Sequence, residues 1–309
     1  MAKFEEFYFD SSTGKNKIHA IKYIPEGEIK GVVQIAHGIA EHINRYEAFM
    51  QFLAENGFVA VGNDHLGHGK SAADESEKGI FAMENGWRYV LMDMLKLHDM
   101  MKNEYPDAKY IMFGHSMGSF LTRNYIIDYP DKYDLAVLSG TGHQNPMLII
   151  GGCLMADALS SAKGADSDGQ QLNDIAFGAY CAKIENPRTP FDWLSVNEEN
   201  IDKYIEDPMC GFVAKTGLYR DMMHGIKYIT SKKNIAKMDV NKPVYFMTGD
   251  ADPVGDYGAG GEKAYKAFCN AGVKDVMMRL YPGGRHEMLN EDNKQQVYDD
   301  ILNWINSKL

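Results

Sequence analysis

Short apolar runs alternate with longer amphipathic segments along the first half of the chain. The runs are bounded by glycine or polar residues, which is typical of strands buried on both faces of a sheet. The segments between them carry apolar residues at helical spacing and stop at glycine or proline, which predicts helices. The predicted strands cover residues 6–9, 18–23, 32–36, 58–61, 110–113 and 135–138, and the predicted helices cover residues 46–56, 87–105 and 118–129.

The alternation stops between residues 141 and 237, where no apolar run is typical of a buried strand. Strand patterns return at residues 244–247 and 276–280, and helical spacing returns at residues 262–270 and 295–307. Strands that alternate with helices predict a mostly parallel sheet covered by helices on both faces. We therefore expect an α/β core, formed by residues 1–140 and 238–309, that carries residues 141–237 as an inserted helical cap.

Composition and charge exclude several classes of function. The 309 residues are 45% hydrophobic and 24% charged, as in an ordinary globular protein, and the net charge of -11 argues against a nucleic-acid partner. No apolar run is typical of a secretory signal or long enough for a transmembrane segment. The four cysteines are far apart, which argues against disulfides and a zinc site. We expect a cytoplasmic protein, and nothing in the sequence specifies its oligomeric state.

A nucleophile motif follows one of the predicted strands. Residues 114–118 read Gly-His-Ser-Met-Gly, which fits G-x-S-x-G between a strand and a helix. A sharp strand-to-helix turn leaves no room for side chains at the flanking positions, and it exposes the serine hydroxyl at the C-terminal edge of the sheet. The alternative is a serine that caps the helix of an ordinary Gly-rich turn. We predict that Ser116 is the nucleophile and that the backbone N–H of Met117 faces the oxyanion.

Candidates for the base and the acid follow two later strands. A serine hydroxyl is a poor nucleophile until a base takes its proton, and with this type of turn the acid and the histidine follow the serine in the chain. His286 comes after the predicted strand at 276–280, and Asp252 comes after the one at 244–247. We predict that His286 is the base and that Asp252, which precedes a proline in a turn, orients it. The alternatives for the acid are Asp250 and Asp256.

The loop after the strand at 32–36 is where a second oxyanion N–H is expected. Gly38 lets the backbone turn close to the substrate, and we predict that Ile39 N–H is the donor, with an effect of about 3–4 kcal/mol on the barrier. This loop and the next contain further polar residues, whose Gly-rich spacing favours a hydrogen-bonded network over metal ligation. They are His37, Glu41, His42, Arg45, Asp64, His65 and His68. We expect no metal and no cofactor.

Three motifs taken together resemble one protein family. Residues 37–46 read His-Gly-x-x-Glu-His-x-x-Arg-Tyr, residues 64–71 read Asp-x-x-Gly-His-Gly-x-Ser, and residues 114–118 complete the set. With cap segments at 191–195 and 204–212, they resemble the monoacylglycerol lipase and lysophospholipase family of α/β-hydrolases, notably its bacterial members, which share sequence with S33-type serine aminopeptidases. The resemblance implies an α/β-hydrolase fold with an apolar acyl tunnel in the cap. It places Ser116, Asp252 and His286 at the triad positions, and Ile39 and Met117 at the oxyanion positions.

The leading hypothesis is therefore a serine hydrolase that cleaves esters of single acyl chains, such as monoacylglycerols or lysophospholipids, with transient membrane contact through the cap. Cap methionines are candidates for an adaptable acyl pocket. These are Met147, Met155, Met209, Met222 and Met223. An esterase for small esters, an aminopeptidase and a catalytically silent scaffold are alternatives, although the complete triad argues against the last. An aminopeptidase needs cap carboxylates to hold an ammonium group, and the candidates are Glu185, Glu198, Glu199, Asp202 and Glu206.

Overall fold

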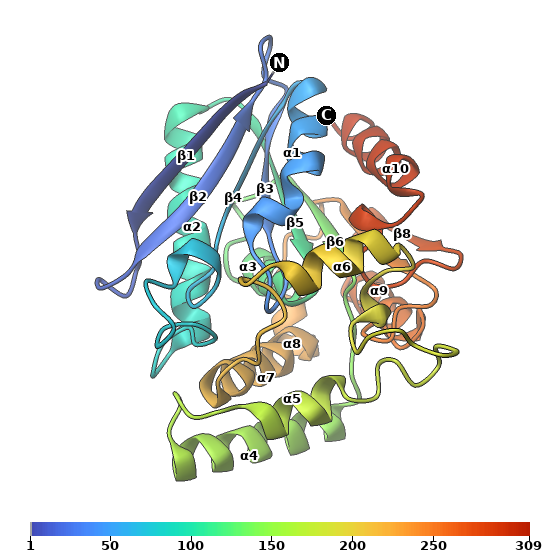
Figure 1. Cartoon of the computed structure of the whole chain (residues 1–309). Coiled ribbons are helices and arrows are strands. Elements are labelled where there is room, and N and C mark those ends of the chain that lie inside the picture. The colour runs from blue at the N-terminus through green and yellow to red at the C-terminus, as the bar shows by residue number, and fades with distance from the viewer. Residues whose placement is uncertain (1) are drawn as a thin grey trace.

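The structure is a computed structural model that describes residues 2–309, and one eight-stranded sheet forms its centre (Figure 1). The strand order is β1-β2-β4-β3-β5-β6-β7-β8, in which β2 pairs antiparallel with β1 and β4, and the remaining pairs are parallel. The strands are β1 (Lys3–Asp10), β2 (Lys17–Ile24), β3 (Gly31–Ala36), β4 (Phe58–Asn63), β5 (Lys109–His115), β6 (Leu135–Ser139), β7 (Val244–Gly249) and β8 (Val276–Tyr281).

Helices cover both faces of this sheet, which confirms the predicted fold class. Apolar residues of α1 and α10 pack on one face, and apolar residues of α2, α3 and α9 pack on the other. Strands β3, β4, β6 and β7 are buried at every position, which explains their continuous apolar sequences. The helices are α1 (Glu47–Glu55), α2 (Gly86–Glu104), α3 (Met117–Asp128), α9 (Ala259–Asn270) and α10 (Lys294–Asn306).

The chain between β6 and β7 is helical and lies beyond the C-terminal ends of the parallel strands (Figure 1). Among the described residues 141–237 the only β pairing is an isolated bridge between Asp168 and Lys215. The division into a core and a cap at these boundaries stays a prediction. The helices here are α4 (Pro146–Lys163), α5 (Gln170–Phe177), α6 (Glu198–Glu206), α7 (Thr216–Thr230) and α8 (Lys232–Ile235).

Short 3-10 turns lie beside the loops that matter for the site. They cover Ile43–Tyr46, Gly69–Ser71, Asp192–Leu194 and Met288–Asn290. Since β3, β5, β7 and β8 are parallel, their carboxyl ends meet at the same edge of the sheet, and the segments that follow them come together there. Over residues 2–309, none of the helices is both long and apolar enough to cross a bilayer.

Candidate active site

Ser116 occupies a strained turn between β5 and α3. Its φ of 54° and ψ of -122° lie outside the regions that non-glycine residues normally adopt, and it immediately precedes the first residue of the helix. Ser116 N–H donates to Ser139 O of the neighbouring strand, and Ser116 O accepts from Ser119 N. Ser116 thus stands at the C-terminal end of β5, as the G-x-S-x-G motif predicts, and its side chain contributes to a cavity.

The glycines that flank Ser116 allow other backbone segments to approach this turn closely. A Cβ at Gly114 would lie 2.3 Å from Gly118 O, and a Cβ at Gly118 would lie 2.0 Å from Ala36 O. These distances are far inside van der Waals contact with rigid backbone atoms. The flanking positions are therefore glycine because β3, β5 and α3 converge here.

His286 and Asp252 contact each other although they lie on different loops. His286 Nδ1 is 3.0 Å from Asp252 Oδ2, and both side chains are buried. Asp252 also accepts hydrogen bonds from Thr248 Oγ1 at 3.0 Å and from Val254 N at 2.9 Å. His286 Nε2 has no hydrogen-bond partner within residues 2–309, and the side chain lines the same cavity as Ser116.

The other two candidate acids have different environments. Asp250 is exposed and accepts from Gly283 N at 2.7 Å, so it holds the turn after β8. Asp256 is exposed and lies 3.6 Å from Lys263 Nζ. Of the three candidates, Asp252 is the one whose carboxylate contacts His286.

Charge pairing outweighs burial at the His286 and Asp252 pair. Burial disfavours the charged form of each group, but the charge and hydrogen bond of the partner prevail. The pKa of Asp252 is consequently held below its ordinary value, and the pKa of His286 is raised above its ordinary value. Neighbouring His115 has no such carboxylate contact, so burial and then the charge of His286 lower its pKa to about 4.

The loop after β3 passes directly beside Ser116. A Cβ at Gly38 would lie 3.1 Å from Ser116 Cβ and 2.7 Å from Glu41 Oε1, so only glycine fits. The backbone N–H groups of Ile39 and Met117 have no acceptor within the described chain, and Ile39 lines the cavity. Both N–H groups thus remain available beside the serine.

A buried ion-pair network joins this loop to the residue after His286. Arg45 Nη1 donates to Glu41 Oε2 and to Glu287 Oε1, each at 2.7 Å, and Arg45 Nη2 donates to Glu287 Oε2 at 2.7 Å. Glu41 in turn accepts from Gly38 N and from Tyr46 Oη. Burial opposes ionisation of Glu287, but the charge of Arg45 prevails and lowers its pKa to about 2. The network fixes the two loops relative to each other.

Three histidines of the polar motifs, His37, His65 and His68, are buried in the loops after β3 and β4. His65 N–H donates to His37 Nε2 at 2.9 Å, so His37 carries its proton on Nδ1, which donates to Gly38 O. Burial lowers the pKa of His37 and of His65, and it lowers the pKa of His68 to about 3. Asp64 accepts from Ile43 N and Lys70 N, each at 2.8 Å. His37 and Asp64 thus support the loop by hydrogen bonds, whereas the ring nitrogens of His65 have no partner among the described residues and the ring packs 4.1 Å from that of His37.

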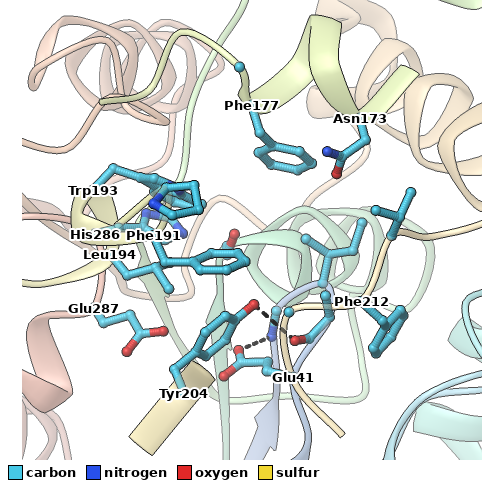
Figure 2. Close-up of a pocket in the computed structure, with 18 of the residues that line it drawn as sticks. Glu41, Asn173, Phe177, Phe191, Trp193, Leu194, Tyr204, Phe212, His286 and Glu287 are labelled. Carbon is cyan, nitrogen blue, oxygen red and sulfur yellow. Dashed lines mark hydrogen bonds between the residues drawn. The ribbon is translucent and has the colours of Figure 1, made fainter. Parts of the chain in front are cut away.

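A cavity of about 330 Å³ lies over Ser116 and His286 (Figure 2). Aromatic side chains from the 141–237 segment form much of its wall. They are Phe177, Phe191, Trp193, Tyr204, Phe212 and Tyr219. The Trp193 ring centroid is 5.2 Å from that of His286, and Tyr204 Oη donates to Ala40 O at 3.0 Å. The wall therefore contacts His286 through Trp193 and is hydrogen-bonded to the loop after β3 through Tyr204.

Comparison with known proteins identifies the family of the chain. The family described as serine aminopeptidase, S33, matches residues 27–293. The chain belongs to this family. A monoacylglycerol lipase of Mycolicibacterium smegmatis is 27% identical over 296 residues, which are 93% of this chain and 92% of that protein. Human monoglyceride lipase is 23% identical over 288 residues, which are 92% and 85% of the two chains.

One solved structure is similar to this chain over nearly its whole length. A thermostable carboxyl esterase from Bacillus coagulans, in complex with glycerol, superimposes with a TM-score of 0.92 and 32% identity over 99% of each chain. The resemblance to monoacylglycerol lipases inferred from the motifs is confirmed, and so is the α/β-hydrolase fold. The protein is an enzyme, a serine hydrolase of the S33 family.

Two sets of residues considered for the pocket of this S33 hydrolase lie elsewhere. Within the described chain, none of the five cap methionines lines the cavity; Met147 and Met155 are exposed, and Met222 is packed in the core. None of the five cap carboxylates proposed for an aminopeptidase lines it either. Aromatic side chains, rather than these methionines, form the wall of the cavity.

Sequence reasoning did not find the partners that connect the cap to the base. Glu287 N donates to Leu194 O at 2.7 Å, and Arg285 Nη1 donates to Asp192 O and to Ser195 O. These pairs are separated by about ninety residues along the chain, and no local pattern marks them.

Proposed function

We propose that this S33 hydrolase cleaves carboxylic esters that carry one acyl chain, such as monoacylglycerols or lysophospholipids. The observation that carries the proposal is the aromatic cavity over Ser116 and His286. Such a wall favours an apolar chain by removing its surface from water, with an effect of about 0.8 kcal/mol per buried methylene group. The names of the relatives, monoacylglycerol lipase and carboxyl esterase, support the same substrate class.

Each group has a role in the proposed reaction. His286 Nε2 accepts the hydroxyl proton of Ser116, whose Oγ attacks the ester carbonyl carbon. The N–H groups of Ile39 and Met117 donate to the oxyanion of the tetrahedral intermediate. His286 then protonates the leaving alcohol, and water releases the acid from the acyl-enzyme. Asp252 holds the ring of His286 with Nδ1 protonated and stabilises the imidazolium that forms.

The carboxylates around the cavity favour an ester over the ammonium group of a peptide. Three of them line it, namely Glu41, Asp174 and Glu287. Glu41 and Glu287 are both ion-paired with Arg45, so neither is unpaired. Asp174 is exposed on α5 and accepts from Gln170 Nε2 at 2.6 Å. A buried, unpaired carboxylate that could hold a substrate ammonium is therefore lacking among the described residues that line the cavity.

Turnover of two substrate series tests this proposal. We expect kcat/KM for p-nitrophenyl esters to rise with acyl chain length from acetyl upward, and we expect aminoacyl-anilides to be much slower. A fluorophosphonate probe should label the wild type and fail to label Ser116→Ala. Faster anilide turnover would support the aminopeptidase, and a maximum at acetyl would support an esterase for small esters. Labelling that persists in Ser116→Ala would exclude this serine as the nucleophile.

We also propose that α4 contacts the lipid surface on which such substrates reside. Large apolar side chains on this helix face solvent, and Met147, Leu148 and Leu154 are 78%, 68% and 66% exposed. Apolar side chains exposed together on one element are a common mark of interaction surfaces.

Flotation with phosphatidylcholine vesicles tests the contact by α4. We expect the wild type to float with the vesicles and Leu148→Asp/Leu154→Asp to float much less. Both should hydrolyse a short, soluble ester at the same rate. Leu280→Asp is a matched control, because Leu280 is 43% exposed on β8, an edge strand of the sheet, and not on α4. Equal flotation of all three proteins would contradict the proposal.

A further inference from the structure

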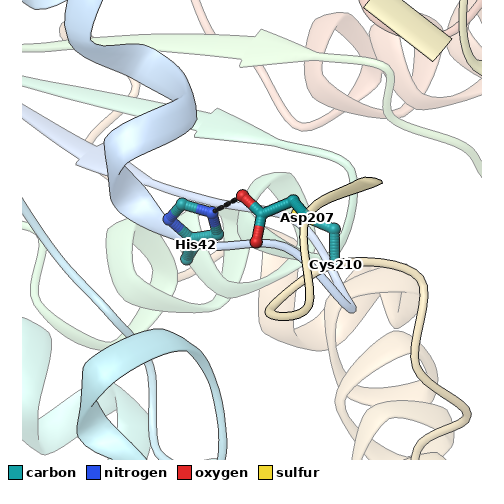
Figure 3. Close-up of side chains that lie close together, drawn as sticks. All are labelled: His42, Asp207 and Cys210. Atoms are coloured by element: carbon teal, nitrogen blue, oxygen red, sulfur yellow. Dashed lines mark hydrogen bonds and ion pairs between the residues drawn. The ribbon is translucent and has the colours of Figure 1, made fainter. Parts of the chain in front are cut away.

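Three potential metal ligands meet where the loop after β3 contacts the segment that follows α6 (Figure 3). A ring nitrogen of His42, a carboxylate oxygen of Asp207 and Sγ of Cys210 all lie within 4.8 Å of one another. His42 Nε2 and Asp207 Oδ2 form a hydrogen bond of 2.8 Å. His42 and Cys210 are buried, while Asp207 is 27% exposed and gives the cluster access to solvent. None of the three groups has a part in the proposed ester hydrolysis.

The local backbone holds Asp207 and Cys210 on the same side of a tight turn. Cys210 N–H donates to Asp207 O at 2.9 Å, and Met209 N–H donates to Asp207 Oδ1 at 2.8 Å. The next residue, Gly211, donates its N–H to Ala40 O at 2.9 Å and so fixes the turn against the loop that carries His42. The cluster therefore consists of side chains on anchored backbone, which is what a metal site requires.

The charges around the cluster favour a cation. Two carboxylates, Glu41 and Glu287, share the single guanidinium of Arg45, and Asp207 lies beside them with His42 as its partner. The carboxylates of this group therefore outnumber its guanidinium. A divalent cation would compensate this excess, and Arg45 is already bound to Glu41 and Glu287.

We propose that His42, Asp207 and Cys210 form a binding site for a zinc-class divalent cation. Imidazole, carboxylate and thiolate are the ligand types that Zn²⁺ takes, and three protein ligands leave a fourth position for water. Zinc bonds of about 2.0–2.3 Å imply ligand separations of roughly 3.3–3.7 Å in a tetrahedron. His42 Nε2 and Asp207 Oδ2 must move apart by about half an ångström, and a ligand pair at the outer limit of 4.8 Å must close by about one ångström.

Binding must break the hydrogen bond between His42 and Asp207 and must release the thiol proton of Cys210 to the buffer. His42 Nδ1 has no partner among the described residues, so no second group fixes the ring in its ligating tautomer. Both features reduce affinity, and we expect micromolar rather than nanomolar binding. A bound zinc ion would connect the segment after α6 to the loop after β3, which also carries the N–H of Ile39. Zinc would therefore regulate the active site and would not take part in the reaction.

Calorimetric titration of the full chain with Zn²⁺ tests the proposal in a Cys269→Ser background, which removes an exposed thiol. We expect one ion to bind per chain, and titration with Co²⁺ should produce a thiolate-to-cobalt charge-transfer absorption. Asp207→Asn and Cys210→Ser should each weaken zinc binding by at least about tenfold, and Cys210→Ser should abolish the absorption. Mg²⁺ should not bind, because it avoids thiolate and imidazole ligands.

A surface pair provides the matched control. His224 Nε2 and Asp157 Oδ1 make a similar contact at 2.9 Å, but within residues 2–309 they belong to no group of three ligands. His224→Ala should therefore leave zinc affinity and the cobalt spectrum unchanged. Equal zinc affinity in the background protein and in its folded Asp207→Asn and Cys210→Ser variants would overturn the proposal, as would a cobalt complex without thiolate absorption. These readouts do not depend on ester hydrolysis, so the proposed function stands or fails separately.

Discussion

Two histidine-containing regions at the same edge of the sheet have opposite electrostatics. After β8, His286 contacts the carboxylate of Asp252, and its pKa is raised. After β3 and β4, His37, His65 and His68 are equally buried, and their pKa values are lowered. The nearby Asp64 directs its carboxylate to His19 and to backbone N–H groups rather than to these rings. The difference between the regions is one carboxylate contact.

That contact separates a group that can exchange a proton near neutral pH from groups that only pack and accept or donate hydrogen bonds. Without a carboxylate partner, a buried imidazole stays neutral. The three histidines beneath the loop are therefore suited to support it. A His-rich and Asp-rich motif consequently carries no catalytic meaning until the partner of each ring is known.

Removal of the proposed base should give the largest effect. We expect His286→Ala to lower kcat for a p-nitrophenyl ester by about 10⁴- to 10⁶-fold, because Ser116 then has no proton acceptor. We expect His68→Phe, in the other region, to change kcat by less than about tenfold. Steady-state kinetics measure both, with thermal unfolding to verify that each variant is folded. Similar losses in two folded variants would remove the distinction between the regions.

Loss of the carboxylate contact alone should have the next largest effect. Asp252→Asn keeps the size of the side chain but no longer favours protonation of His286 at Nδ1, and kcat should fall by roughly 10⁴-fold. Asp250→Asn is the matched control, since Asp250 is exposed and accepts a hydrogen bond from Gly283 N. The kcat of this variant should change by less than about tenfold. The reverse order would assign the orienting role to Asp250.

The pH dependence of kcat/KM should report the raised pKa of His286. Only the neutral ring accepts a proton from Ser116, so activity should fall as the pH falls through the pKa of His286. Because this pKa is raised, the acid limb should have its midpoint above about 6.5, the ordinary value for histidine. In Asp252→Asn the residual activity should show a midpoint at lower pH. A wild-type midpoint below 6 would contradict the contribution of the carboxylate.

The smallest effect concerns stability. His68 has a folded pKa of about 3, so between that value and about 6.5 the unfolded chain binds its proton and the folded chain does not. His68 should therefore lower the free energy of unfolding by up to about 1.4 kcal/mol per pH unit as the pH falls through this range. Urea unfolding of the wild type and His68→Phe should show a shallower pH dependence in the variant. Identical pH dependence would mean that His68 is not held neutral.

The alternation of strands and helices could be predicted because each buried strand carries its own continuous apolar sequence. The same holds for Ser116, since the steric demands of its turn appear locally as Gly114 and Gly118. The order of Asp252 and His286 after later strands was also predictable, because parallel strands bring their carboxyl ends to one edge. Only the structure, however, shows that Asp252 rather than Asp250 contacts His286. The two carboxylates are two residues apart, and the turn after β7 decides which one is buried.

The sequence by itself therefore determined the fold class, the nucleophile motif and the family resemblance, all of which depend on neighbouring residues. The tertiary structure decided what lies above and around Ser116. Aromatic side chains, not the cap methionines, line the cavity. Arg45, which pairs with Glu41, also reaches Glu287, 242 positions away in the chain. His42, Asp207 and Cys210 meet in the same way. Such contacts come from the packing of the 141–237 segment on the sheet, and packing between distant segments leaves no local periodicity in the sequence.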